Sequence, residues 1–486
     1  MNVSQDRRPV IVALVYIVIS CLFLLQSASL IRFYHSTIPD QADLDVHLTI
    51  PVHRQFQSPD GSFHGIPMYY TDKVLQSEVR CIGENFESTS WYYQSCQFRD
   101  MCYDLNTKEF VLYTDQIPRE RSDVYISTVP YNKTVAGGGQ PAAWFLKVSR
   151  GKFFPTIRTT PIRGYYQLTS NIVWLPYFPQ SACNPGHLVW DTFLPLFILM
   201  EIFDIADLQP LLFQMSHDAN SYRRQQIDSA MCPDILEKFL PLMGIFNLSS
   251  VSNNTFLNVT FVGKSQSNLV CAPTSAAGVG MLTDHGLSQH GQMKEDYLKP
   301  HNVGRALLLR RFRAFALRNA NIPDIGLHST ANDKTLTITF NTFSSGAIER
   351  TTQFGKQMEA VQNAFHNKSF GINVQQVVLR ELTLSEQISL CTQSAVFVTT
   401  GGGGTVTATF LPKGATLIIF YHERDTDGFP VKMDWDLWNH YADINVHWLP
   451  IKTMNNREDL HILVEIMKHD LQVLQEDWDN AARGLG

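Results

Sequence analysis

Apolar and polar positions follow a regular rhythm in the last third of the chain. Beyond about residue 321, short apolar runs alternate with amphipathic stretches. The expected strands are residues 335–341, 373–379, 395–400 and 416–421, and the expected helices are residues 353–366 and 384–393. This β-α-β-α-β series predicts a parallel, doubly wound sheet. A long amphipathic helix is expected afterwards, over residues 457–478.

The first half has a mixed pattern. Residues 109–115 and 171–178 are typical of strands, whereas residues 187–203 form an apolar run that is too long for a strand. That run predicts a buried helix, with Pro185 in its first turn. Residues 304–320 predict a second helix, made amphipathic by its arginines.

The N-terminus predicts a membrane anchor. Residues 10–31 carry no charge and are long enough to span a bilayer. Arg7 and Arg8 precede them, which favours a cytosolic tail of residues 1–9 and a lumenal body. Residues 32–77 are polar and broken by prolines, so we expect a stem there. A cleaved signal peptide, cut near "SAS" at Ser27–Ser29, is the alternative.

Cysteines and sequons indicate the secretory pathway. Five N-x-[ST] sequons begin at Asn132, Asn247, Asn253, Asn258 and Asn367. Seven cysteines follow the anchor: Cys81, Cys96, Cys102, Cys183, Cys232, Cys271 and Cys391. In an oxidising lumen most of them are expected to form disulfides, and the odd number leaves at least one outside an internal pair. The net charge of −6 gives no basic surface for nucleic acid.

Four glycines, residues 401–404, stand between an expected strand and a short helix. In parallel sheets that edge binds ligands, and bare backbone N–H groups there can approach a diphosphate closely. A tight turn that needs glycine only for packing explains the run equally well. Dinucleotide binding is a further alternative, since Glu423 and Asp425 lie about where a ribose-binding acid is expected, but the third glycine of that motif is replaced by Thr407.

Three segments resemble glycosyltransferase family 61. They are "SCQFRDMCYD" (residues 95–104), "NPGHLVWDTFLPLF" (residues 184–197) and "LSEQISLCTQSAVFVTTGGGGTVTATFLPKGATLII" (residues 384–419). The resemblance implies an α/β fold of GT-B form, in which two Rossmann-like domains face each other across a cleft. It implies an acceptor-side domain over residues 78–325, a nucleotide-sugar domain over residues 326–455 and a last helix, within residues 456–486, that returns to the first domain.

Asp191 is the expected catalytic base. It is the only acid between Asn184 and Met200, and few charges are buried without a partner or a task. His187 lies four residues earlier, on the same helix face, and is expected to orient Asp191, contact a substrate or act as the base itself. A solvated aspartate and a hydrogen-bonded core histidine are the plainer interpretations.

The donor site is expected in the second domain. Gly402, Gly403, Gly404 and Thr405 form the candidate diphosphate loop. The resemblance assigns Arg350 to a phosphate and Glu386 to the ribose, although Glu386 also fits a capping box with Thr383. No metal and no cofactor are expected. The acids at Asp425 and Asp427 offer a metal-dependent GT-A alternative, but solvated loop carboxylates explain them better.

The combined prediction is an inverting, metal-independent glycosyltransferase. It transfers a sugar of the N-acetylglucosamine, xylose or arabinose class from a UDP-sugar to a hydroxyl of a glycoprotein or glycan. We expect a single-pass type II Golgi membrane protein, with the endoplasmic reticulum as the alternative. An inactive, glycan-binding relative is the alternative function, because the loop lacks the family's histidine at Gly401 or Gly402 and its basic residue near Asn341.

Overall fold

The computed structural model describes residues 68–82, 95–107, 109–115, 124–125, 152–177, 185–214, 235, 238–244, 267–278, 306–324, 327, 335–342, 352–366, 371–423, 430–431, 435–441 and 443–482. The expected anchor, the five sequons, Cys183 and Cys232 lie outside these ranges. Within them, no helix is both long enough and apolar enough to cross a bilayer.

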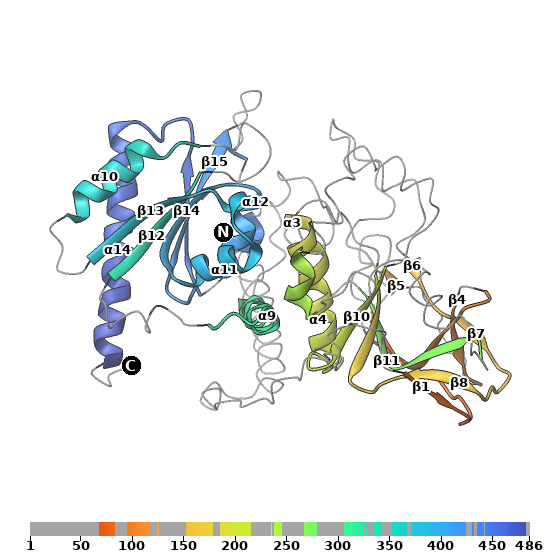
Figure 1. The fold of residues 1–486 in the computed structure, drawn as a ribbon. Helices are drawn as coiled ribbons and strands as arrows, with labels where there is room; N and C mark the ends of the chain where they lie inside the picture. Colours follow the sequence, from red (N-terminus) through yellow and green to blue (C-terminus); the bar gives the residue numbers. More distant parts are fainter. Residues whose placement is uncertain are drawn as a thin grey trace, which may run out of the picture. The chain divides into compact units, whose positions relative to one another are not determined.

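The second half contains a parallel sheet with helices on both faces (Figure 1). Its parallel strands are β12 (Thr335–Asn341), β13 (Gly371–Val377), β14 (Ser394–Thr400), β15 (Thr416–Glu423) and β17 (Asn445–Pro450). They lie in the order β13-β12-β14-β15-β17, and the short β16 (Pro430–Val431) is antiparallel to β15. All seven residues of β14 are buried, as expected for a central parallel strand. The predicted α/β fold is confirmed here.

Helices cover the parallel sheet in two groups. On one face α10 (Gly355–Phe365) packs against α14 (Arg457–Ala482), and on the other α11 (Leu384–Thr392) contacts α12 (Gly403–Ala408); the crossover helix α13 spans Trp435–Asn439. α14 was expected to return to the first domain, but its described contacts hold it to the second sheet. Asp470 on α14 accepts hydrogen bonds from Thr416 and His447, which belong to β15 and β17. The apolar stripe of α14 therefore covers its own sheet.

The first half contains a larger, mixed sheet. Its nine strands are β1 (Met68–Thr71), β2 (Glu78–Ile82), β3 (Ser95–Asp104), β4 (Glu109–Tyr113), β7 (Thr156–Arg158), β8 (Tyr165–Leu168), β9 (Ile172–Tyr177), β10 (Gln209–Gln214) and β11 (Leu269–Ala277). β3 runs antiparallel to β2, β4 and β11, whereas β11 runs parallel to β8 and β9. A separate ribbon pairs β5 (Val124–Tyr125) with β6 (Lys152–Phe153). The doubly wound parallel pattern is thus established for the second sheet, and the first sheet differs from it.

The start of the folded body lies earlier in the chain than expected. β1 pairs with β8, and Leu75 is buried, so residues 68–77 belong to the first sheet although the sequence pattern placed them in the stem. The reason is that β1 is a short edge strand whose two tyrosines remain partly exposed, which leaves little apolar periodicity to detect.

Two disulfides cross-link β3 to its neighbours. Cys81 on β2 is bonded to Cys96, and Cys102 is bonded to Cys271 on β11. In both cases the cysteines are directly opposite each other in the strand register. These bonds indicate an oxidising compartment, either lumenal or extracellular, as the sequence predicted.

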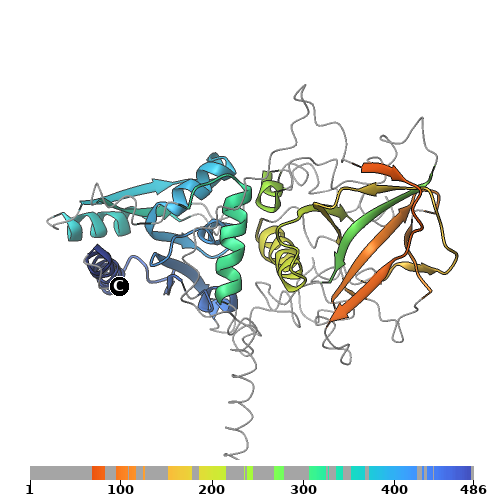
Figure 2. The same cartoon turned by 90° about the horizontal axis from the view of Figure 1, so that it is seen from below.

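A helical layer connects the two sheets through one continuous apolar core. It contains α3 (Pro185–Leu188), the π-helical turn η2 (Val189–Phe193) and α4 (Leu194–Ile202), which are continuous in the chain, together with the short η3 (Leu240–Met243) and α9 (Ala306–Asn319). The Phe197 ring contacts the rings of Phe312 and Phe315 on α9, with centroids 5.7 and 4.9 Å away. Both views show α9 beside α4 (Figures 1 and 2). The helices predicted over residues 187–203 and 304–320 are confirmed.

Candidate functional site

The strand order places the glycine run at a topological switch point. Counted along the chain, the parallel strands lie in the order 2-1-3-4-5, so the connections from β12 and β14 leave in opposite directions. Ligands of open α/β sheets bind in the crevice at such a point, beyond the carboxyl ends of the two strands. β12 ends at Asn341, whose buried amide donates to the Thr399 hydroxyl at 3.0 Å, and the glycines follow β14 directly. The expected position of the loop is therefore confirmed.

The conformation of the loop depends on glycine. Gly402 has φ +118° and ψ −146°, a region that residues with a Cβ avoid. The Gly401 N–H donates to the Phe420 carbonyl on β15 at 3.2 Å, and the Thr405 N–H donates to the Gly402 carbonyl at 2.9 Å. Gly402 and Gly404 are buried, whereas Gly401 and Gly403 are half-buried. The backbone conformation thus explains the glycine at position 402, while Gly403 is partly accessible to solvent.

The threonine hydroxyls of α12 are engaged within the protein. Thr405 donates to the Gly402 carbonyl at 2.6 Å, and Thr407 donates to Oε1 of Gln387 on α11 at 3.3 Å. Neither hydroxyl proton is directed at a ligand in this conformation. α12 has only six residues, so its helix dipole is a small contribution. Recognition of a diphosphate here would rest on backbone N–H groups of the loop.

The helix that carries His187 and Asp191 lies against α12. α3 contacts α12, and the Trp190 indole donates to the Thr409 hydroxyl, one residue after α12, at 3.0 Å. The Trp190 ring also contacts Trp438 edge to face, with centroids 5.6 Å apart. The segment containing Asp191 and the segment following the glycines are thus neighbours. The side chains of His187 and Asp191 lie outside the described part of the structure, so their orientation stays a prediction.

Asp191 is the middle residue of the π-helical turn Val189–Phe193. π-turns widen a helix by one residue, are rare, and are frequent at functional sites. The next residue, Thr192, is fully buried, and its hydroxyl has no hydrogen-bond partner among the described residues. Neither feature was predicted, because an apolar run does not reveal a π-turn. The anchoring role of Trp190 was missed for the same reason.

Glu386 is explained by its place in the helix. It forms the predicted capping box, since its carboxylate accepts from the Thr383 N–H at 2.7 Å and the Thr383 hydroxyl accepts from the Glu386 N–H at 3.3 Å. The hydrogen bond from the Thr383 backbone lowers the pKa of the Glu386 carboxyl. A contact between Glu386 and a ribose stays a prediction.

The remaining candidates fall outside the described residues. Arg350 follows β12 in the segment 343–351, and Asp425 and Asp427 lie between β15 and β16. In the portion that is described, no group of three or more histidine, cysteine or acidic side chains is arranged to hold a metal ion.

Comparisons with known proteins leave the chain unassigned. No family model matches it, and no curated protein matches it. Among solved structures it is similar to the metal-soaked Flv1 flavodiiron core from Synechocystis sp. PCC6803, with 9% sequence identity, a TM-score of 0.22, and coverage of 83% of this chain and 100% of that chain. A likeness at this score carries no argument about fold or function.

Proposed function

We propose that the protein is an inverting glycosyltransferase that uses a nucleotide-sugar donor, with the parallel sheet as a GT-B-like donor domain, the donor loop at residues 401–404 and Asp191 as the base. One observation carries the proposal: the helical segment containing Asp191 packs against α12, which begins within the glycine run at the switch point of the parallel sheet. Two segments about 210 residues apart in sequence therefore meet where such sheets bind ligands.

The proposed reaction is a single displacement. An acceptor hydroxyl oxygen attacks the anomeric carbon and the bond from that carbon to the diphosphate oxygen breaks, so the nucleoside diphosphate leaves with the electron pair. Asp191 takes the hydroxyl proton as the new bond forms. The backbone N–H groups of Gly402 and Gly403, together with the Arg350 guanidinium, stabilise the charge that develops on the diphosphate. The sugar is inverted because attack and departure occur on opposite faces.

The compartment agrees with this activity. The two disulfides indicate an oxidising lumenal or extracellular environment, and the lumenal alternative is the one that suits a transferase acting on glycoproteins and glycans. Residence in the Golgi, anchored by residues 10–31, is part of the proposal.

An inactive, glycan-binding relative is the second candidate. The hydroxyl protons of Thr405 and Thr407 are engaged within the protein, which leaves the loop with fewer donors for a diphosphate than the sequence suggested. Under this alternative the fold is kept and the transfer reaction is lost.

A transfer assay with an Asp191→Asn variant tests the proposal. The full-length protein, purified in detergent, is incubated with a panel of UDP-sugars, and release of UDP is measured. We expect release from one or two donors, and a loss of roughly 10²- to 10⁴-fold in rate for Asp191→Asn, as is usual for removal of a general base. Asp207→Asn is the matched control, because this exposed aspartate lies just beyond α4. An Asp191→Asn variant as active as the control would exclude Asp191 as the base.

A further inference from the structure

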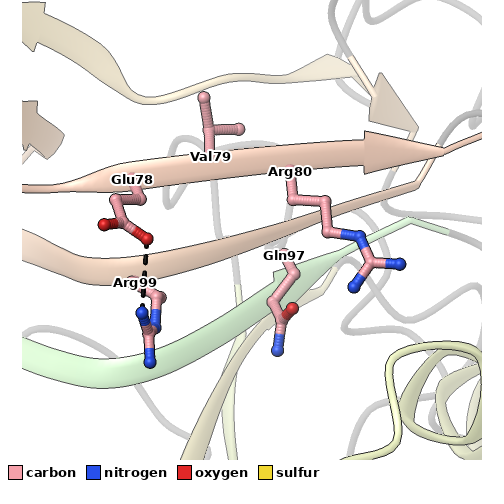
Figure 3. Close-up of a pocket in the computed structure, with 5 residues that line it drawn as sticks. All are labelled: Glu78, Val79, Arg80, Gln97 and Arg99. Atoms are coloured by element: carbon pink, nitrogen blue, oxygen red, sulfur yellow. Dashed lines mark hydrogen bonds and ion pairs between the residues drawn. The ribbon is translucent and has the colours of Figure 1, made fainter. Parts of the chain in front are cut away.

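A pocket of about 350 Å³ lies on β2 and β3, in the first sheet. It is lined by Glu78, Val79 and Arg80 from β2 and by Gln97 and Arg99 from β3. Figure 3 shows the four polar side chains on one side of the strands and Val79 directed to the other side. The volume is at the lower end of the range of roughly 300–1,000 Å³ that small-molecule sites occupy.

The strand register fixes the arrangement of the polar groups. Arg80 is directly opposite Gln97, and Glu78 is directly opposite Arg99. The two arginines are thus diagonal neighbours, about 7–8 Å apart between their Cα atoms, which is within reach of one bound molecule. Arg99 Nη1 is 3.3 Å from Glu78 Oε2, while no described carboxylate lies within ion-pair distance of Arg80. Among the residues described around it, the pocket therefore carries two positive charges and one negative charge.

The Arg99–Glu78 pair is open to solvent. The two side chains are 70% and 66% exposed, so the ion pair itself adds little to stability. It does, however, present a donor beside an acceptor, which matches the two functions of neighbouring sugar hydroxyls. Gln97 offers both functions in one amide, and the planar guanidinium of Arg80 suits a carboxylate or sulfate.

We propose that this pocket binds an acidic sugar residue, with its carboxylate or sulfate on Arg80 and its hydroxyls on Gln97 and the Arg99–Glu78 pair.

Neighbouring residues favour a sugar over an acidic peptide. Asp100, the chain neighbour of Arg99, accepts a hydrogen bond from the Gln167 amide at 2.9 Å. The carboxylates of Glu78 and Asp100 would repel a run of acidic side chains. An oligosaccharide with few charges and many hydroxyls would be repelled much less.

Binding of defined oligosaccharides to the full-length protein in detergent tests this site. The probes are a tetrasaccharide of alternating glucuronate and N-acetylglucosamine, a neutral N-acetylglucosamine tetrasaccharide, tetraglutamate and sodium sulfate. Affinities are measured by ligand-observed NMR for the wild type and for Arg80→Gln, with Arg163→Gln as the matched control at an exposed arginine outside the pocket. Thermal unfolding of each variant verifies that it is folded.

The acidic tetrasaccharide is expected to bind roughly five-fold more tightly than the neutral one, and Arg80→Gln to abolish that difference while Arg163→Gln preserves it. Equal binding of the two tetrasaccharides, or an Arg80→Gln variant that keeps the preference, would overturn the proposal. Tetraglutamate binding as tightly as the acidic tetrasaccharide would indicate a peptide site instead, and sulfate binding as tightly would indicate a bare anion site; either result contradicts the assignment. No nucleotide donor is present, so the outcome is independent of whether the protein transfers sugars.

Discussion

The mixed sheet of the first half is held by two disulfides, whereas the second half, in its described residues, keeps its cysteine, Cys391, as a buried thiol. The two halves also differ in how far apart in sequence their paired strands lie. β3 pairs with β11 across a sequence separation of 169 residues at the Cys102–Cys271 bond, while each strand of the parallel sheet is linked to the next by a short crossover. Long-range pairing is entropically expensive, and covalent cross-links reduce that cost.

The largest predicted effect concerns that disulfide. Replacing Cys102 and Cys271 together by alanine should lower the free energy of unfolding by about 5 kcal/mol, the loop entropy of a bridge that closes about 169 residues. Cys391→Ala in the parallel sheet should cost only about 1 kcal/mol, for the loss of one buried sulfur atom. Urea denaturation of the full-length protein measures both. Equal losses would show that the cross-link does not support the mixed sheet.

Each half contains a buried carboxylate, and the two carboxylates have different hydrogen-bond partners. Asp104 at the end of β3 accepts from the Arg158 guanidinium at 2.8 Å, whereas Asp470 on α14 accepts from His447 at 2.7 Å and from the Thr416 hydroxyl at 2.8 Å. Burial raises the pKa of each carboxyl, but these hydrogen bonds outweigh it, so both pKa values are lower than usual. The ionised form is therefore favoured in the folded state of both sheets.

Asp470→Asn should lower the free energy of unfolding by roughly 2 kcal/mol at pH 7, because it weakens several hydrogen bonds to a buried charged group. A depressed pKa contributes stability that is present above the unfolded value of about 4 and is lost as the pH falls through the folded pKa. The difference between the wild type and Asp470→Asn should accordingly shrink between pH 5 and pH 3 in urea titrations. Asp104→Asn should behave alike; a difference that grows as the pH falls would refute the assignment for either residue.

Two glycines of the parallel sheet allow a smaller test. Gly402→Ala should destabilise the protein by about 1–3 kcal/mol, because its φ of +118° is strained for a residue with a Cβ. Gly355→Ala should be neutral or stabilising by up to about 1 kcal/mol, since a Cβ at this start of α10 meets nothing within 4 Å. Thermal unfolding measures the stability of the two variants. If both substitutions destabilised the protein to the same extent, the positive φ of Gly402 would not explain its effect.

The parallel sheet could be predicted from the sequence because its information is local. Each apolar run, such as residues 335–341, is followed by a helix before the next parallel strand begins, and the handedness of crossovers leaves few arrangements. The capping box of Thr383 and Glu386 was likewise encoded within four residues. The loop of glycines then had to lie at the carboxyl edge of the sheet.

The mixed sheet could not be predicted in this way. β11 lies between β3 and β8, although about 100 residues separate β8 from β11 in the chain, and no turn signal connects them. The pairing of Cys102 with Cys271 depends on that register, so it could not be predicted from the sequence either. The packing of α14 on its own sheet also depends on tertiary contacts, here those of Asp470, that an amphipathic pattern does not specify.

Within the site, the sequence identified the loop and the helix but not how they meet. The contact depends on the Trp190 indole reaching Thr409, two residues that lie in unrelated apolar runs. The π-turn around Asp191 is equally invisible in a run of apolar letters.

Binding of UDP to the glycine loop tests the central claim most directly. Thermal unfolding of the full-length wild type is compared with that of Gly403→Glu, because an acidic residue at the first position of α12 is favourable for the helix while its carboxylate would repel a diphosphate. The account predicts that millimolar UDP raises the Tm of the wild type by a few degrees and leaves that of Gly403→Glu unchanged. No shift of the wild type, an equal shift of the variant, or a larger shift with NAD than with UDP would contradict it.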